Sequence, residues 1–206
     1  MAGIERICIE SDFSSDRRVK MARVHEPAMN ELYQKIFAEI GMPLASGIEA
    51  IRCTKTEAQS RYDWQEGIDV LLYFANGTKA TLQEKCLTFH ASTVTFEEHK
   101  TSGAQGAWYY CTAQYYFIGY DRIEANDFQD WILIDLPALH RADANLPWKF
   151  NKNTREGRRA TFRFLYFGDV PSNCIVARLK ADKPAVIARP RQAKQMVMPN
   201  IFNITR

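Results

Sequence analysis

The feature that most restricts the fold of this chain is a tight-turn signal, Asn76-Gly77, between two segments of β-forming residues. Residues 68–74 and 79–89 are rich in branched and aromatic side chains, which favour extended strands. An Asn-Gly pair readily adopts the positive φ angles that short hairpin loops require. The sequence therefore predicts an antiparallel β-hairpin, which any fold of this chain has to contain.

The register of this hairpin depends on the length of its loop. A three-residue loop, residues 75–77, places Asp69 opposite Gln83. In that register Lys85 lies diagonal to Asp69. A two-residue Asn-Gly turn pairs Asp69 with Glu84 instead and points Lys85 away from it. We favour the three-residue loop, because it also aligns apolar residues of the two strands.

An amphipathic helix is predicted before the hairpin. Apolar residues recur every four positions from Val24 to Ile40, the spacing of one helix face. Pro27 interrupts this pattern, so the helix either begins near Glu26 or kinks there. We favour a helix that begins there, with Pro27 in its first turn, and that ends at residues 41–43, Gly-Met-Pro.

Further strands are predicted later in the chain. The candidates are residues 93–96, 131–136, 163–167 and 174–179, and residues 107–121 indicate a helix that passes into a strand. A helix followed by an open mixed sheet predicts an α/β or α+β domain. The length of 206 residues suits one domain. We expect residues 1–148 to form its core and residues 149–206 to be a basic part packed on that core or extending it.

Charge divides the chain near the same position. Residues 1–148 carry 14 Lys and Arg against 21 Asp and Glu, a net charge of −7, whereas residues 149–206 carry 13 against 3, a net charge of +10. Basic side chains neutralise phosphates, and carboxylates hold divalent cations. This division suits a protein that handles a polyanion, and a solvated basic tail is the alternative.

Composition excludes several classes of protein. The chain is 46% hydrophobic and 25% charged, which is ordinary for a globular protein and unlike a disordered one. Its charged start, and apolar runs far shorter than the about 20 residues that cross a bilayer, predict a cytoplasmic protein without a membrane partner. The five cysteines form no Cys-x-x-Cys pair, so neither a disulfide framework nor a zinc site is indicated.

The hairpin resembles that of the PD-(D/E)XK nucleases, the superfamily of many restriction endonucleases. The likeness rests on Gly67-Ile68-Asp69, then a hairpin, then Gln83-Glu84-Lys85, with an acidic helix before them. It implies a restriction-endonuclease-like α/β core, in which helices flank a mixed central sheet and the hairpin carries the site. It also implies an enzyme that hydrolyses DNA with Mg²⁺, or with Mn²⁺ in its place.

The resemblance also assigns roles to individual residues. By position, Asp69 is the metal ligand, and Lys85 orients or deprotonates the attacking water. Gln83 stands where the family has a second acid, and it would offer the metal a neutral carbonyl oxygen. Glu84 becomes a further metal ligand if a bulge rotates it toward Asp69. Glu31 is the best-placed helix residue for the additional acid that the family often uses, and paired sites for cutting both strands imply a homodimer.

A second group of residues is basic and follows Trp148. It interleaves cations with amides and aromatic rings, which suits contact with a phosphate backbone and an exposed base. Arg163 ends this group, and we expect nucleic-acid contacts from Lys149, Lys152, Arg155, Arg158 and Arg159. The alternative to a DNA-cleaving enzyme is a catalytically inactive nucleic-acid-binding or interaction module on the same fold, which Gln83 favours. An oxygen-ligated metal hydrolase of a small substrate is a third reading.

Overall fold

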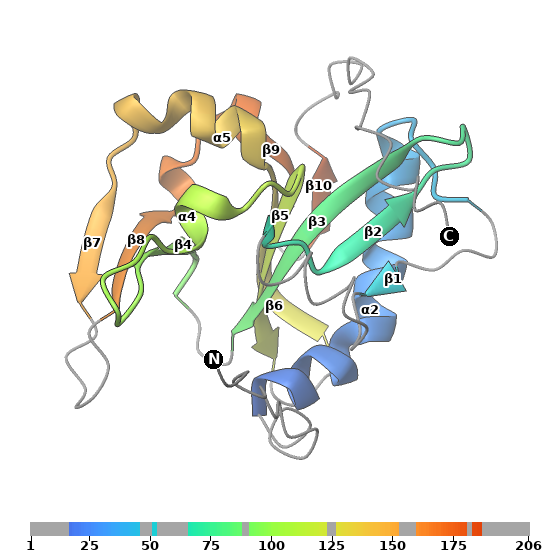
Figure 1. Ribbon diagram of the computed structural model, residues 1–206. Helices are drawn as coiled ribbons and strands as arrows, with labels where there is room; N and C mark the ends of the chain where they lie inside the picture. Colours follow the sequence, from blue (N-terminus) through green and yellow to red (C-terminus); the bar gives the residue numbers. More distant parts are fainter. Residues whose placement is uncertain are drawn as a thin grey trace, which may run out of the picture.

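The computed structural model describes residues 17–45, 51–52, 66–87, 91–122, 127–152, 160–180 and 183–186. Within these ranges the chain forms a seven-stranded sheet, a separate three-stranded sheet and three α-helices (Figure 1). The structure is thus of the mixed α/β kind that the sequence predicts. No α-helix among these residues combines the length and the apolar composition needed to cross a membrane.

The large sheet is mixed and has the strand order β1-β2-β3-β5-β6-β9-β10. Its strands are β1 (Ile51–Arg52), β2 (Val70–Tyr73), β3 (Lys79–Leu87), β5 (Tyr115–Arg122), β6 (Asp127–Asp135), β9 (Ile175–Lys180) and β10 (Lys183–Val186). Among these described strands, only β3 and β5 pair in parallel. Parallel neighbours need a long crossover, which here contains β4 and α4.

The β2–β3 hairpin has the three-residue loop that we favoured. Val70 pairs with Leu82, and the N–H of Asp69 donates to the Leu82 carbonyl at 2.9 Å, so Asp69 stands opposite Gln83. Gly77 closes the loop with a φ of 80°, a left-handed conformation that costs glycine little. The predicted register is therefore confirmed.

Helix α2 (Arg17–Glu39) covers one face of the large sheet. Its apolar stripe Met29, Tyr33, Ile36 and Phe37 is buried against Val70, Leu72, Leu82 and Phe117. Pro27 lies inside the helix, and Figure 1 shows the helix axis bending. The prediction that Pro27 occupies the first turn is therefore wrong. The helix tolerates the lost backbone hydrogen bond, because the turns after the proline are anchored on the sheet.

The small sheet lies on the other side of the large sheet from α2 (Figure 1). Its strands pair antiparallel in the order β4 (Thr93–His99), β8 (Thr161–Tyr166) and β7 (Lys149–Lys152). One apolar cluster joins both sheets to α4 (Ala107–Tyr110) and α5 (Leu136–Ala142). The described residues on this side also form three short 3-10 helices: η2 (Asp143–Asn145), η3 (Phe167–Asp169) and η4 (Ser172–Cys174).

Side chains of the large sheet bind the open edge of β4. The Tyr120 hydroxyl accepts the N–H of Thr93 at 3.0 Å and donates to the Thr93 carbonyl at 2.8 Å. The Tyr116 hydroxyl and the Lys85 ammonium donate to the Thr95 carbonyl at 2.9 and 3.1 Å. The two sheets are thus joined by polar contacts as well as by the apolar cluster.

The C-terminal part of the chain contributes to both sheets. β8 pairs with β4, and β9 pairs with β6, so residues after 148 complete structures that earlier residues begin. The predicted passage from helix to strand within residues 107–121 is confirmed by α4 and β5. β7 was not predicted, because its four residues are all exposed and carry no apolar alternation.

Candidate active site

Asp69 and Gln83 meet at the start of β2. Oδ2 of Asp69 accepts the backbone N–H of Glu84 at 2.8 Å, and it also accepts a hydrogen bond from the side-chain nitrogen of Gln83. Asp69 directly precedes β2, and Glu84 follows the last residues of β3 that pair with β2. The Asp69 carboxylate can therefore accept the backbone N–H of Glu84, which no β2 carbonyl uses. Both side chains are half-buried. The structure therefore brings this predicted pair together.

Lys85 lies two residues after Gln83 on β3, so the two side chains share one face of the sheet. The small sheet covers this face, and the ammonium of Lys85 donates to the Thr95 carbonyl of β4. Tyr116, which pairs with Gln83 across β3 and β5, donates to the same carbonyl. Asp69, Gln83 and Lys85 are therefore on one side of the sheet, as the predicted register requires.

The Glu84 side chain lies on the opposite face, beneath α2. Its Oε1 accepts a hydrogen bond of 2.8 Å from the Tyr33 hydroxyl. The pairing of β3 with β5 runs without interruption from Leu82 to Leu87, so no bulge rotates Glu84. The structure does not bring this carboxylate to Asp69. The hydroxyl of Tyr33 instead gives it a partner within the apolar layer.

Glu31 is also placed away from Asp69. Its side chain is 73% exposed on α2 and forms an ion pair of 3.9 Å with Lys35. Because α2 covers the face opposite Gln83 and Lys85, the structure does not bring Glu31 to Asp69, Gln83 or Lys85.

Burial keeps the groups around Asp69 protonated. It raises the pKa of the Cys111 thiol to about 12, and it raises the pKa of the Tyr116 hydroxyl well above its usual value. The negative charge of Asp69 shifts both pKa values in the same direction. Cys111 and Tyr116 therefore act as hydrogen-bond donors at neutral pH and add no negative charge to the site.

The oxygen atoms at Asp69 suit a hard divalent cation. Mg²⁺ is commonly bound through one or two carboxylates and keeps several waters. Asp69 and the side-chain oxygen of Gln83 fit such a set, provided that the Gln83 amide turns its oxygen toward the ion. Within the described residues, no group of three or more His, Cys, Asp or Glu could hold a metal. A cation at Asp69 would therefore take most of its ligands from water.

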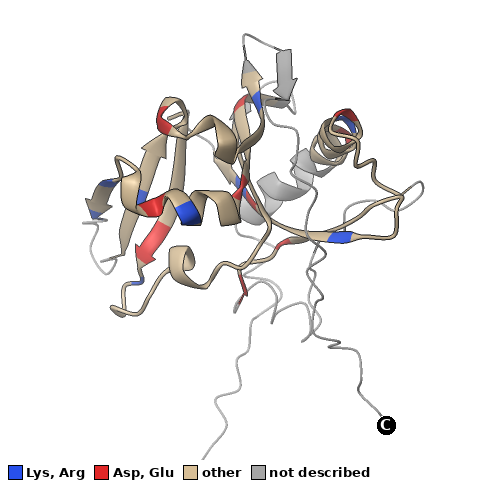
Figure 2. Cartoon of the chain, turned by 90° about the horizontal axis from the view of Figure 1, so that it is seen from above, with Lys and Arg blue, Asp and Glu red and all other residues tan. Residues whose placement is uncertain are grey.

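The structure describes only some of the residues that are predicted to contact nucleic acid. Lys149 and Lys152 are exposed on β7, and the Lys149 ammonium lies 4.4 Å from the centre of the Tyr166 ring. Arg155, Arg158 and Arg159 lie outside the described residues. Figure 2 shows acidic and basic residues interspersed along the described elements. β7 is therefore the part of the predicted basic surface that the structure places.

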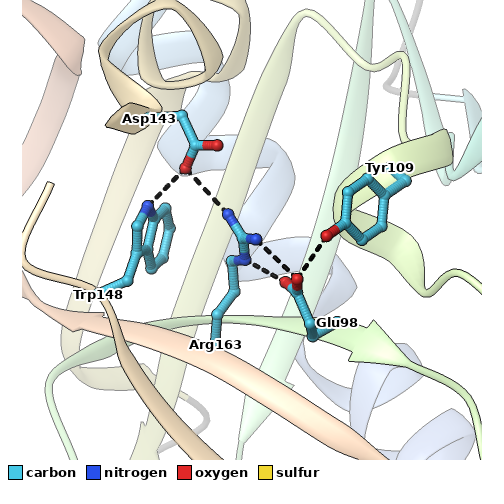
Figure 3. A network of polar contacts seen from close by, with 5 residues as sticks. All are labelled: Glu98, Tyr109, Asp143, Trp148 and Arg163. Carbon is cyan, nitrogen blue, oxygen red and sulfur yellow. Dashed lines mark hydrogen bonds and ion pairs between the residues drawn. The ribbon is translucent and has the colours of Figure 1, made fainter. Parts of the chain in front are cut away.

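Arg163 belongs instead to an internal polar network (Figure 3). Its guanidinium forms an ion pair with Glu98 and donates to Oδ1 of Asp143 at 2.9 Å. Asp143 also accepts from the Trp148 indole at 2.6 Å, and Glu98 accepts from the Tyr109 hydroxyl. Arg163, which the sequence groups with the basic residues after Trp148, does not extend the basic surface, because its charge is paired inside the protein with Glu98 and Asp143.

This network was missed because Glu98 and Arg163 are 65 residues apart in sequence. One local signal exists: Glu98 follows Val94 and Phe96 at alternate positions of β4, so it points into the apolar layer. The hydrogen bonds from Arg163 lower the pKa of Glu98, which keeps this buried carboxylate ionised. Arg163 also stacks 4.6 Å from the centre of the Trp108 ring. The network thus joins β4, β8, α4 and η2.

Comparison with family models gives no match for this chain, and comparisons with curated proteins and with solved structures give none either.

Proposed function

We propose that this chain is a Mg²⁺-dependent nuclease that hydrolyses DNA phosphodiester bonds on a restriction-endonuclease-like core. The observation that supports this proposal is the register of the β2–β3 hairpin, with Asp69 opposite Gln83 and Lys85 on the side of Gln83. These are the carboxylate, the amide and the ammonium to which the resemblance assigns the metal and the attacking water, with the amide in place of the family's second acid.

In this proposal each of the three side chains has a separate task. Asp69 and the side-chain oxygen of Gln83 hold the cation, and Lys85 orients or deprotonates the attacking water. When bound, Mg²⁺ neutralises phosphate charge and lowers the pKa of a bound water. The bond from Lys85 to the Thr95 carbonyl fixes the direction of the ammonium, which has three donors to distribute.

The test is a cleavage assay on supercoiled, linear and branched DNA with Mg²⁺, with Mn²⁺ and with EDTA. We expect metal-dependent cleavage that Asp69→Ala abolishes and Lys85→Met reduces by about 10²-fold or more. Urea unfolding should show that Lys85→Met costs only about 1 kcal/mol, the value of one hydrogen bond. Lys79→Ala, on the exposed end of the hairpin, is the matched control and should cleave normally.

The second candidate is a catalytically inactive nucleic-acid-binding module. It is favoured by the partners that the candidate residues already have, because Gln83 donates to Asp69 and Lys85 donates to Thr95. Binding of DNA without cleavage in any metal would support this module and contradict the nuclease.

The proposed nuclease would cut both strands as a homodimer, which size-exclusion chromatography with light scattering would detect.

A further inference from the structure

The small sheet has one packed face and one partly open face. Phe96, Arg163 and Leu165 are buried on the packed face, against α4 and the large sheet. The alternate residues of β8 therefore point the other way. Of these, Phe162 and Phe164 are half-buried, and Tyr166 at the end of the strand is 44% exposed.

β7 extends this open face with a cation and an amide. Lys149 pairs with Phe164, so their side chains share a face. The Lys149 ammonium lies over the ring of Tyr166, and the rings of Phe164 and Tyr166 are 6.0 Å apart at an angle of 88°. Asn151, which pairs with Phe162, continues the same row. We call Lys149, Asn151, Phe162, Phe164 and Tyr166 the aromatic face.

We propose that the aromatic face binds single-stranded nucleic acid by stacking its unpaired bases. Base stacking on an aromatic side chain contributes about 1–3 kcal/mol per base and needs no particular sequence. Alternate residues of a strand are about 6.6 Å apart, so the three aromatic side chains form a row along which successive bases can lie. A duplex offers only base edges in its grooves, so ring faces suit unpaired bases.

Charge favours the same ligand. Residues 149–206 carry a net charge of +10, and Lys149 places one of these cations beside the most exposed ring of the face. A phosphate that binds this ammonium would draw it off the Tyr166 ring and so free that ring face for a base. Glu97, which pairs with Phe162, adds a carboxylate on the β4 side. We therefore expect the phosphates to follow β7 and the bases to lie over β8.

The aromatic face adjoins the candidate active site through β4. Thr95 pairs with Phe164, and the carbonyl of Thr95 accepts the hydrogen bond from Lys85. Neighbouring β-strands lie about 4.8 Å apart. A nucleic-acid strand bound over β8 would therefore be separated from the β4 edge that Lys85 contacts by one such spacing. This inference rests on the proposed function where it makes single-stranded regions the preferred substrate. The binding itself does not depend on catalysis.

The test is fluorescence anisotropy in EDTA, with an oligothymidine of about 20 nucleotides and a duplex of the same length. We expect the single strand to bind more tightly than the duplex. Tyr166→Ala should weaken its binding between about fivefold and 150-fold. Lys149→Ala should reduce the slope of log affinity against log salt by about 0.7.

Matched controls use the same chemistry elsewhere in the fold. Lys79 lies 5.0 Å from the ring of Tyr73 on the β2–β3 hairpin, so Tyr73→Ala removes a similar pair. Phe150→Ala removes a ring that is 62% exposed and lies on the other face of β7, opposite Arg163. Both variants should bind the single strand as the wild type does. Thermal melting of each variant verifies that it is folded.

Three outcomes would overturn the inference: Tyr166→Ala binding like the wild type, the duplex binding as tightly as the single strand, or polyglutamate competing as well as the oligonucleotide. Asp69→Ala should retain single-strand binding. Binding that depends on Tyr166 without any cleavage would remove the proposed nuclease and leave the aromatic face standing. Cleavage together with single-strand binding that is indifferent to Tyr166→Ala would remove the aromatic face and leave the proposed nuclease standing.

Discussion

The hydrogen bond between Gln83 and Asp69 gives the amide at position 83 a specific task. It supplies a donor to a half-buried carboxylate that also accepts the N–H of Glu84. A glutamate at this position would bring a second negative charge to the same oxygen and remove that donor. An amide therefore stabilises the hairpin without metal, and it lowers the charge available to attract one.

We predict that Gln83→Glu destabilises the metal-free protein by about 1–3 kcal/mol, because a hydrogen bond is replaced by repulsion between two carboxylates. Added Mg²⁺ should restore this loss in the variant and stabilise the wild type less. Thermal unfolding with EDTA and with Mg²⁺ measures the difference. An equal response of both proteins to Mg²⁺ would contradict a cation site at Asp69.

Glu98 makes the stability of the fold depend on acid. Its pKa is held below the ordinary value of 4.5, chiefly by the hydrogen bonds from Arg163. The unfolded chain therefore takes up a proton at this residue before the folded chain does. The stabilisation is complete above pH 4.5 and is lost as the pH falls through the lower pKa of the folded state.

We predict that Glu98→Gln lowers the free energy of unfolding at neutral pH by about 3 kcal/mol, because it leaves the buried Arg163 without its main counter-charge. The variant should also lose less stability than the wild type between pH 5 and pH 3, a range set by the ordinary glutamate pKa. Urea unfolding at several pH values measures both effects. Parallel pH curves for the two proteins would exclude Glu98 as the titrating group.

At the scale of the elements, the open edge of β4 is held by side chains from outside its own sheet. We predict that Tyr120→Phe destabilises the protein by about 2–3 kcal/mol, because it leaves the N–H and the carbonyl of Thr93 without their partner. Hydrogen exchange should show faster exchange of the Thr93 amide. Tyr73→Phe, on the hairpin, serves as the control. A normal exchange rate in Tyr120→Phe would show that this contact does not hold the edge of β4.

The elements that could be predicted are those whose signals are local. The hairpin followed from Asn76-Gly77, and α4 followed by β5 was indicated by a segment dense in aromatic residues. The start of α2 was misplaced because proline statistics describe an isolated helix, whereas packing on a sheet compensates for one lost bond. β7 could not be predicted, because its pairing with β8 is made by the backbone of four exposed residues that show no apolar alternation.

In the candidate site, too, the contacts set by local structure could be predicted and those set by packing between distant elements could not. The contact of Asp69 with Gln83 depends only on the hairpin register, so the sequence was sufficient for it. The position of Glu84 beneath Tyr33 depends on which face α2 covers. The bond from Lys85 to Thr95 depends on a second sheet that crosses over the first. Neither arrangement leaves a periodic signal in the chain.

At the scale of the whole molecule, the sharp change of charge near residue 148 does not separate two folding units. The joint apolar cluster includes Leu165, Phe167, Val170, Cys174 and Ile175, all from beyond that position. Burial of one large apolar side chain contributes about 1.5–3 kcal/mol. The four large apolar side chains among them, Leu165, Phe167, Val170 and Ile175, together contribute an amount comparable to the whole stability of a typical domain, about 5–15 kcal/mol.

We predict that a chain ending at residue 148 does not fold. It would lack the partner of β6 on one side and the partner of β4 in the small sheet. Near-ultraviolet circular dichroism should show no fixed aromatic packing, and urea should produce no cooperative transition, in contrast to the full chain. A cooperative transition in the shortened chain would instead make residues 1–148 an autonomous core.

The contacts at the edge of β4 also bear on aggregation. Exposed strand edges recruit foreign strands through unpaired backbone groups, and such recruitment leads to fibrils. On β4, the Thr93 and Thr95 groups that could template this process are taken by Tyr120, Tyr116 and Lys85. The opposite edge of the small sheet, β7, carries Lys149 and Lys152, and charged lysines discourage stacking of identical chains. Both edges of the small sheet therefore disfavour self-assembly: hydrogen bonds from side chains occupy the edge of β4, and lysine charges lie along the edge of β7.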